Sequence, residues 1–107
     1  MYRIRKYRRT NGRIPFDEWL NTIKDSSTKT RLLKRLDKVQ LGNLGDWGSL
    51  GDGVFELREH FNQGFRIYYG LEDQAVILLL CGGDKSTQVK DVSKAKQYWQ
   101  EYKHARD

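Results

Sequence analysis

Residues 54–71 read VFELREHFNQGFRIYYGL, and apolar and polar side chains alternate along both halves of this stretch. Alternation of this kind is typical of β-strands that turn one face toward a core. One face collects the apolar side chains Phe55, Leu57, Phe61, Phe65, Ile67, Tyr69 and Leu71. The other face collects Glu56, Arg58, His60, Arg66 and Tyr68. The stretch therefore predicts a β-hairpin with one apolar and one polar face.

The turn between the two runs predicts the strand register. Asn62-Gln63-Gly64 is suited to a three-residue hairpin loop, because Gly64 adopts a left-handed conformation without a steric cost. This loop pairs Phe61 with Phe65, His60 with Arg66, and Arg58 with Tyr68. A two-residue loop would pair Phe61 with Arg66 and would mix the faces, so we expect the longer one.

The apolar run at 75–81 predicts a central strand that is covered on both sides. It ends at Gly82-Gly83, which brings Asp84 and Lys85 to the rim of the same sheet. A cluster of arginine, histidine and lysine on the polar face suits phosphate binding, because forked guanidinium donors match phosphate oxygens. Ordinary cross-strand charge pairs on a solvated face would give the same pattern.

The remaining segments predict a strand at 1–7, a helix starting at Pro15, a second helix capped by Ser26 or Ser27 and ended by Gly42, and a last helix starting between Thr87 and Ser93. The apolar faces of these helices are Phe16, Trp19, Leu20 and Ile23; Leu32, Leu33, Leu36 and Val39; and Val92, Ala95, Trp99 and Tyr102. The glycine-rich residues 43–53 read as a linker pinned by Trp47 and Leu50. The order β-α-α-β-β-β-α predicts one α+β domain over residues 1–107, with an antiparallel sheet packed against two N-terminal helices and a C-terminal helix.

Basic charge is concentrated in the first part of the chain. Residues 1–38 contain 12 Lys and Arg against 4 Asp and Glu, whereas the rest contains 8 against 10. This asymmetry favours a polyanion such as nucleic acid, although an acidic protein would be served equally well. The candidate contacts are Arg8 and Arg9 in a loop, and Lys29, Arg31, Lys34, Arg35 and Lys38 on the second helix.

Other features argue against whole classes of protein. No apolar run approaches the ~20 residues of a membrane span, and we expect no signal peptide. One cysteine, Cys81, fits a reducing cytoplasm and no internal disulfide. The two histidines and the cysteine lack the spacing of metal ligands, so no metal or other cofactor is expected.

Several segments closely resemble the addiction module killer branch of the RelE/ParE toxins, to which HigB-type toxins are related. These segments are 54–58, 64–69, 78–88 and 90–92, together with Arg13-Ile14-Pro15-Phe16. The resemblance covers nearly the whole chain, and its most specific part is Cys81–Gln88. It implies the compact RelE-like fold and a cytoplasmic toxin of a type II toxin–antitoxin system. Its partner would be a helix-turn-helix antitoxin encoded by an adjacent gene.

Two activities occur among proteins of this kind. RelE-like members are metal-independent endoribonucleases that cut mRNA in the ribosomal A site and so inhibit translation; the 2′-OH attacks the neighbouring phosphate. ParE-like members instead inhibit DNA gyrase and have no nuclease chemistry. The fold does not decide between them. We expect the ribosome-dependent mRNA endonuclease, with gyrase inhibition as the alternative.

The resemblance also implies site residues. Arg66 falls on the arginine after the hairpin glycine, which contacts the scissile phosphate in RelE-like nucleases, and Arg58 falls on the strand arginine before it. Lys85 falls near the basic residue after the strand-end glycine, and the three cations would stabilise a pentacoordinate phosphate. We predict that His60 transfers protons, because histidine titrates near neutral pH; a strand-end surface role is the alternative.

The acid–base groups of RelE itself are not matched. A lysine stands in RelE where this chain has Glu56, and RelE has a catalytic tyrosine near its chain end. Here Glu56 and Glu59 are alternative bases, or they simply pair with arginines. Tyr98 and Tyr102 are the tyrosines to consider in the last helix.

Overall fold

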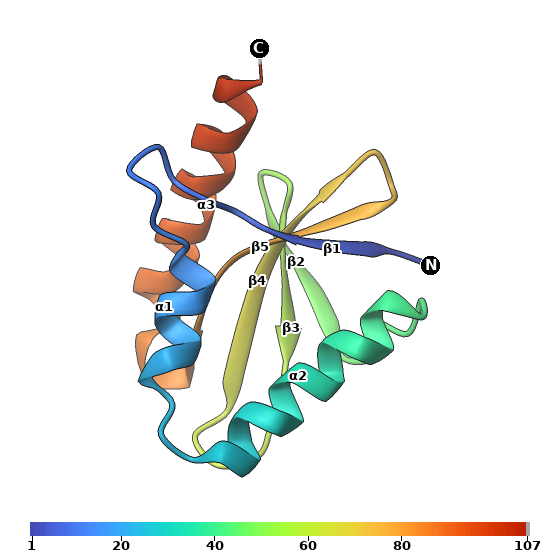
Figure 1. Cartoon of the computed structure of the whole chain (residues 1–107), viewed down its shortest axis with the longest axis vertical. Coiled ribbons are helices and arrows are strands. Elements are labelled where there is room, and N and C mark those ends of the chain that lie inside the picture. The colour runs from blue at the N-terminus through green and yellow to red at the C-terminus, as the bar shows by residue number, and fades with distance from the viewer. Residues whose placement is uncertain (107) are drawn as a thin grey trace.

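The computed structural model describes residues 1–106 and has the α+β architecture expected from the sequence (Figure 1). Its elements are β1 (Arg3–Lys6), α1 (Pro15–Thr22), α2 (Ser26–Gln40), β2 (Trp47–Gly51), β3 (Val54–Arg58), β4 (Phe65–Glu72), β5 (Val76–Asp84), the 3₁₀ turn η1 (Lys85–Thr87) and α3 (Gln88–Ala105). The helices begin and end close to the predicted residues. Asp25, rather than Ser26 or Ser27, caps α2, because its carboxylate accepts a hydrogen bond from the Ser27 backbone N–H at 3.3 Å.

The five strands form one sheet in the order β1-β5-β4-β3-β2. Strand β1 pairs with β5 in parallel, whereas the other neighbours are antiparallel. The sheet is therefore mixed and not wholly antiparallel. The direction of β1 follows from the chain path, since β1 and β5 both lead toward a helix at the same end of the sheet, α1 and α3 respectively (Figure 1).

Strand β2 lies in the segment predicted to be a linker. It pairs with β3 so that Gly48 stands opposite Glu56 and Trp47 opposite Leu57. Its glycines suggest a loop when the sequence is read locally, but Gly48 has a packing reason. A Cβ at Gly48 would stand 2.1 Å from Nη2 of Arg58, so the strand backbone makes room for that guanidinium group.

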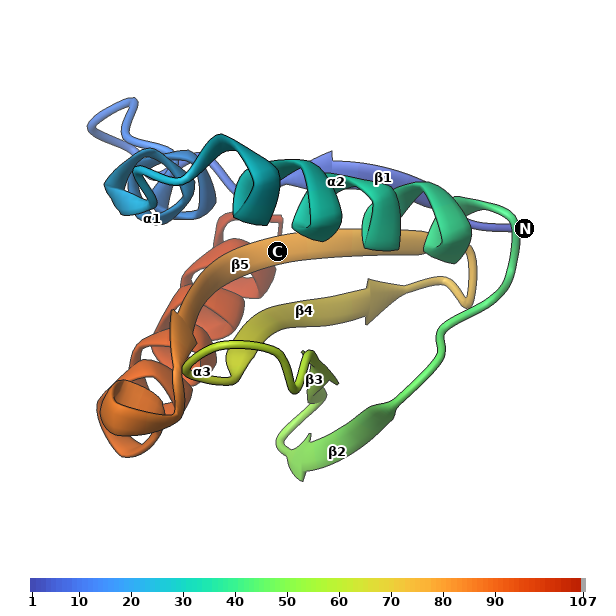
Figure 2. The ribbon, with the colours of Figure 1, turned by 90° about the horizontal axis from the view of Figure 1, so that it is seen from below.

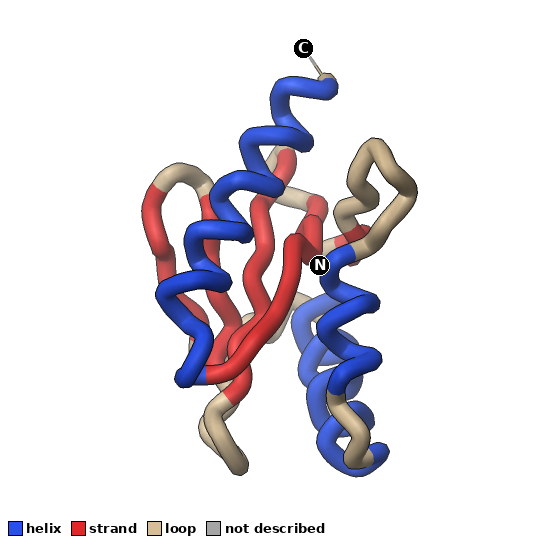
Figure 3. The backbone as a smooth tube through the Cα atoms, turned by 90° about the vertical axis from the view of Figure 1, so that its left-hand side faces the viewer, coloured by secondary structure: helices blue, strands red, loops and turns tan. Residues whose placement is uncertain are grey.

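Helices cover both faces of the sheet. Figure 2 shows α1 and α2 on one side and α3 on the other; in Figure 3, α3 lies across the strands, and α1 and α2 lie together beside them. The first core is formed by Phe16, Leu32, Leu36, Val39, Leu57, Phe65, Ile67, Tyr69, Ile77 and Leu79. The second core, under α3, is formed by Tyr7, Val54, Tyr68, Leu78, Leu80, Cys81, Ala95 and Trp99. Leu33, predicted to face the core, is 45% exposed.

The hairpin register differs from the prediction by two residues. Arg58 pairs with Arg66, and residues 59–64 form the connection, in which the N–H of Gly64 donates to the Phe61 carbonyl at 3.0 Å. A shift of two residues keeps every side chain on its predicted face. Where β3 ends, Arg35 of α2 donates to the Arg58 carbonyl at 2.8 Å and also contacts Glu59.

No helix within residues 1–106 is both long and apolar enough to cross a membrane.

Candidate functional site

Two of the predicted cations stand in one row across the sheet. Arg58 on β3 is opposite Arg66 on β4, which is opposite Gly83 on β5, and neighbouring strands lie about 4.8 Å apart. Lys85 follows Gly83 by two residues, and its backbone N–H donates to the Gly64 carbonyl at 3.0 Å. The three predicted phosphate-binding residues therefore lie at the same end of the sheet. The predicted pairing of His60 with Arg66 is wrong, because Arg58 takes that place.

Glu56 joins the two arginines. Its Oε2 accepts a hydrogen bond from Nε of Arg58 at 3.0 Å, and its Oε1 lies 3.7 Å from Nε of Arg66. Gln88, the first residue of α3, donates to the same Oε1 at 3.4 Å. Glu56 is only 4% exposed and Arg66 only 6% exposed. The carboxylate thus neutralises two guanidinium groups in an environment from which water is largely excluded.

Helix α3 covers the inner half of the predicted polar face. Tyr68 is fully buried there, and its hydroxyl, like Nε of Arg66, has no hydrogen-bond partner among the described residues. Burial raises the pKa of Tyr68 above the usual tyrosine value, and the nearby carboxylates Asp91 and Glu56 add to the shift. The part of the predicted polar face that stays open is therefore limited to the end of β3, around Arg58 and His60.

Asp46 contacts both Arg58 and His60 at the open end of this face. Its Oδ1 accepts a hydrogen bond from Nη1 of Arg58 at 2.7 Å, and its Oδ2 lies 2.6 Å from Nε2 of His60. These contacts, His60 first and Arg58 second, hold the pKa of Asp46 below its usual range. Asp46 lies in the segment read as a linker, and its place beside His60 depends on contacts between residues distant in the sequence.

Arg35 has a different role from the one predicted. It was expected on the nucleic-acid-binding face of α2, but its side chain is only 10% exposed. Nη2 donates to the carbonyls of Leu44 and Asp46 at 2.7 and 2.8 Å, and Nη1 also forms an ion pair with Glu59. Arg35 therefore anchors the loops that carry Asp46 and Glu59. For Glu59, the sequence left open a role as a base or a simple pairing with an arginine, and the structure shows the pairing.

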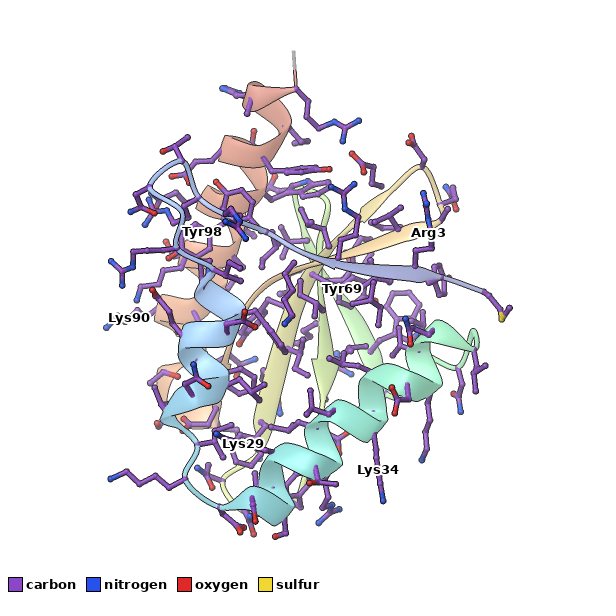
Figure 4. All side chains as sticks on the ribbon, in the orientation of Figure 1. Arg3, Lys29, Lys34, Tyr69, Lys90 and Tyr98 are labelled. Carbon is purple, nitrogen blue, oxygen red and sulfur yellow. The ribbon has the colours of Figure 1, made fainter. Side chains whose placement is uncertain are left out.

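The other predicted nucleic-acid contacts remain accessible to different degrees. Arg8, Arg31, Lys34 and Lys38 are exposed, and Lys29 is half-buried. Figure 4 shows Lys34 extending outward from α2. Arg31 lies over the ring of Phe61, with Cζ 3.7 Å from the centroid. Arg9 contacts Glu101 at 3.4 Å and lies over Tyr98.

The two tyrosines considered for catalysis lie away from this site. The hydroxyl of Tyr102 donates to Glu72, which is six residues along β4 from Arg66, or roughly 20 Å. Tyr98 is ten residues along α3 from Gln88, or about 15 Å, and packs against Tyr7 with ring centroids 5.8 Å apart. Neither tyrosine lies at the Arg58–Arg66 end of the sheet.

A separate groove of about 390 Å³ runs between α1 and α3, and Tyr98 and Cys81 both line it. Cys81 is nevertheless largely buried, and burial raises its pKa to about 12. Its thiol is therefore neutral at physiological pH, as expected for a structural cysteine. Within the described part of the chain, no three His, Cys, Asp or Glu side chains are grouped closely enough to hold a metal ion.

The fold and the cationic end of the sheet together define a RelE-like α+β protein. The chain belongs to the family described as Phage derived protein Gp49-like (DUF891), which matches residues 18–107. This is a RelE-like toxin family of toxin–antitoxin systems, which supports the expected resemblance at the level of the family. An uncharacterized protein of Haemophilus influenzae is 44% identical over 88 residues, covering 82% of this chain and 89% of that relative.

Proposed function

We propose that this protein is the toxin of a type II toxin–antitoxin system and acts as a ribosome-dependent mRNA endonuclease. The observation that carries the proposal is the Arg58–Glu56–Arg66 cluster: two guanidinium groups from opposed strand positions hold one carboxylate between them. A site in which two guanidinium groups pair with one carboxylate has the charge to hold a phosphate instead, whose oxygens match the forked donors of arginine. The toxin-like family supports the same reading.

Free donors at the site support phosphate binding. Nη2 of Arg58 lies over Gly48 and makes no hydrogen bond within residues 1–106. Lys85 is exposed, its stem lies against Gly64, and its ammonium has no ion pair among the residues that the structure describes. In this proposal Arg58 and Lys85 bind the scissile phosphate first. Arg66 joins them when the phosphate replaces the carboxylate of Glu56, so that the buried guanidinium stays paired.

The proposed reaction needs one proton acceptor. His60 is 64% exposed at its side chain and adjoins Arg58 through Asp46. It takes the proton of the 2′-OH while the 2′-oxygen forms a bond to phosphorus and the bond to the 5′-oxygen breaks. The 5′-oxygen then takes up a proton from solvent. The arginines and Lys85 stabilise the additional negative charge on the phosphate during this exchange.

Docking on the ribosome would use the basic surface. In this proposal the exposed cations Arg31, Lys34 and Lys38 of α2, together with Lys29, Arg8 and Arg9, contact phosphates of ribosomal RNA. The cognate antitoxin, a helix-turn-helix protein encoded by an adjacent gene, would neutralise the toxin in the cytoplasm.

The test is induction in bacteria that lack an antitoxin. We expect rapid growth arrest by the wild type and relief by Arg66→Ala, with antitoxin binding retained. Because Arg66 is buried, circular dichroism must show that the variant folds, and Arg66→Lys provides a second variant that keeps the charge but loses the fork. Full toxicity of both folded variants would contradict the proposal. DNA damage signalling that precedes the fall in translation would favour gyrase inhibition.

A further inference from the structure

Asp46 is held in place by its backbone. Its carbonyl accepts hydrogen bonds from the backbone N–H of Arg58 at 2.9 Å and from Nη2 of Arg35 at 2.8 Å. Gly45, just before it, has a φ of +66°, a conformation that favours glycine. The direction of the Asp46 side chain is therefore set by β3 and by α2, although the residue lies in a loop.

The two carboxylate oxygens of Asp46 contact different functional groups. Oδ1 contacts Nη1 of Arg58 at 2.7 Å, and Oδ2 contacts Nε2 of His60 at 2.6 Å. The lowered pKa of Asp46 keeps the carboxylate ionised at neutral pH. An ionised carboxylate has no proton to donate, so it only accepts hydrogen bonds. The contact with His60 therefore requires the proton on Nε2.

We propose that Asp46 is a positioning residue that fixes the Nε2–H tautomer of His60 and makes Nδ1 the atom that accepts the proton of the RNA 2′-OH. This inference rests on the proposed function and adds to it. A neutral imidazole with a proton on Nε2 has its lone pair on Nδ1. The 2′-OH proton moves to Nδ1 as the bond from the 2′-oxygen to phosphorus forms and the bond to the 5′-oxygen breaks. The imidazolium formed in this step is paired with the Asp46 carboxylate.

The same carboxylate aligns the phosphate-binding arginine. Asp46 and Glu56 each hold one edge of the Arg58 guanidinium group, through Nη1 and Nε respectively. Nη2 remains for the substrate. Asp46 thus sets the spacing between the proton acceptor and the first phosphate-binding group, which catalysis requires to be accurate within about 0.5 Å. The neighbouring charged residues Arg35 and Glu59 form an ion pair with each other.

The first experiment needs no activity. Long-range ¹H–¹⁵N correlation spectra of the full chain, recorded in mildly alkaline buffer, report which nitrogen of His60 carries the proton. We expect the Nε2–H tautomer in the wild type and in Asp52→Asn, and a shift toward Nδ1–H in Asp46→Asn, whose amide offers a donor to Nε2. Asp52 is a matched control, because it lies at the other end of β2 and pairs with Lys96 at 3.3 Å. A wild type with the proton on Nδ1, or an unchanged tautomer in Asp46→Asn, would overturn the proposal.

The second experiment measures cleavage of mRNA on purified ribosomes by the same three proteins and by His60→Gln. Asp46→Asn should reduce the cleavage rate at least about tenfold, and His60→Gln by about 10²–10⁴-fold, while Asp52→Asn should cleave as the wild type does. If the tautomer changes but cleavage by Asp46→Asn is unchanged, Asp46 is structural only and the proposed function stands. If the wild type cleaves no mRNA, the proposed function and the catalytic role of Nδ1 both fail, whatever the tautomer.

Discussion

Arg58 and Arg66 lie directly opposite each other on β3 and β4, and both contact the carboxylate of Glu56. Like charges at opposed positions of an antiparallel pair destabilise a sheet. The pairing is tolerated here because Glu56, two residues before Arg58 and on the same face of β3, lies between the two guanidinium groups. The guanidinium groups are therefore already arranged to bind an anion in the folded protein, before any RNA is bound.

Neutralising Glu56 should lower the stability of the protein and strengthen its binding to RNA. In Glu56→Gln the buried Arg66 loses its counter-ion, so we expect the free energy of unfolding to fall by about 3 kcal/mol. The freed guanidinium groups should at the same time bind RNA more tightly and with a steeper salt dependence. Urea denaturation and RNA titrations at several salt concentrations measure the two effects. Weaker RNA binding by a folded Glu56→Gln would argue that Glu56 does not occupy the place of a phosphate.

Gly48 should be required for activity and much less for folding. A Cβ there would stand 2.1 Å from Nη2 of Arg58, and the side chain must swing away to relieve the overlap. We therefore expect Gly48→Ala to reduce mRNA cleavage markedly. The control is Ser49→Ala on the same strand, which should cleave normally. Normal cleavage by Gly48→Ala would show that the position of Arg58 is unimportant.

Arg35 should contribute to stability, whereas its neighbour Lys34 should not. Arg35→Ala removes a side chain that donates to three carbonyls and pairs with Glu59, so the free energy of unfolding should fall by about 3 kcal/mol. Lys34→Ala removes an exposed charge and should change it by less than about 0.5 kcal/mol. Chemical denaturation compares the two; equal effects would contradict the anchoring role of Arg35.

Much of the fold was predictable because it depends on local patterns. Alternation in 54–58 and 65–69, the apolar run at 75–81 and the proline and glycine signals around the helices each specify an element without knowledge of its neighbours. Strand β2 was missed because a glycine opposite Glu56 is favoured by the room that Arg58 needs, which no local pattern shows.

The site was predictable only in part. Arg58 and Arg66 share a face through strand periodicity alone, and the two-residue error in register left that face unchanged. The burial of Arg66 depends on where α3 crosses the sheet, and the contact between Asp46 and His60 joins residues 14 positions apart in different segments. Arg35 looked exposed because a helical pattern does not show which long side chain folds back onto a loop.

Alkaline pH should destabilise the protein. Burial raises the pKa of Cys81, Tyr7 and Tyr69 to about 12, whereas an unfolded chain releases these protons at about pH 8.5 for cysteine and about pH 10 for tyrosine. The folded protein then binds more protons than the unfolded chain, so its stability falls as pH rises from about 9 toward 12. Denaturation midpoints measured across this range should fall, and in Cys81→Ala the decline should begin at higher pH. A flat profile would contradict the burial of these groups.

The most direct measurement is the position of mRNA 5′ ends after induction of the wild type, Arg58→Ala and His60→Gln in cells without antitoxin, with His104→Gln as an exposed histidine control. The proposed chemistry predicts new 5′ ends within translated regions for the wild type and His104→Gln, dependent on active translation, and their loss in the other two variants. Growth arrest by the wild type with unchanged 5′ ends would contradict it.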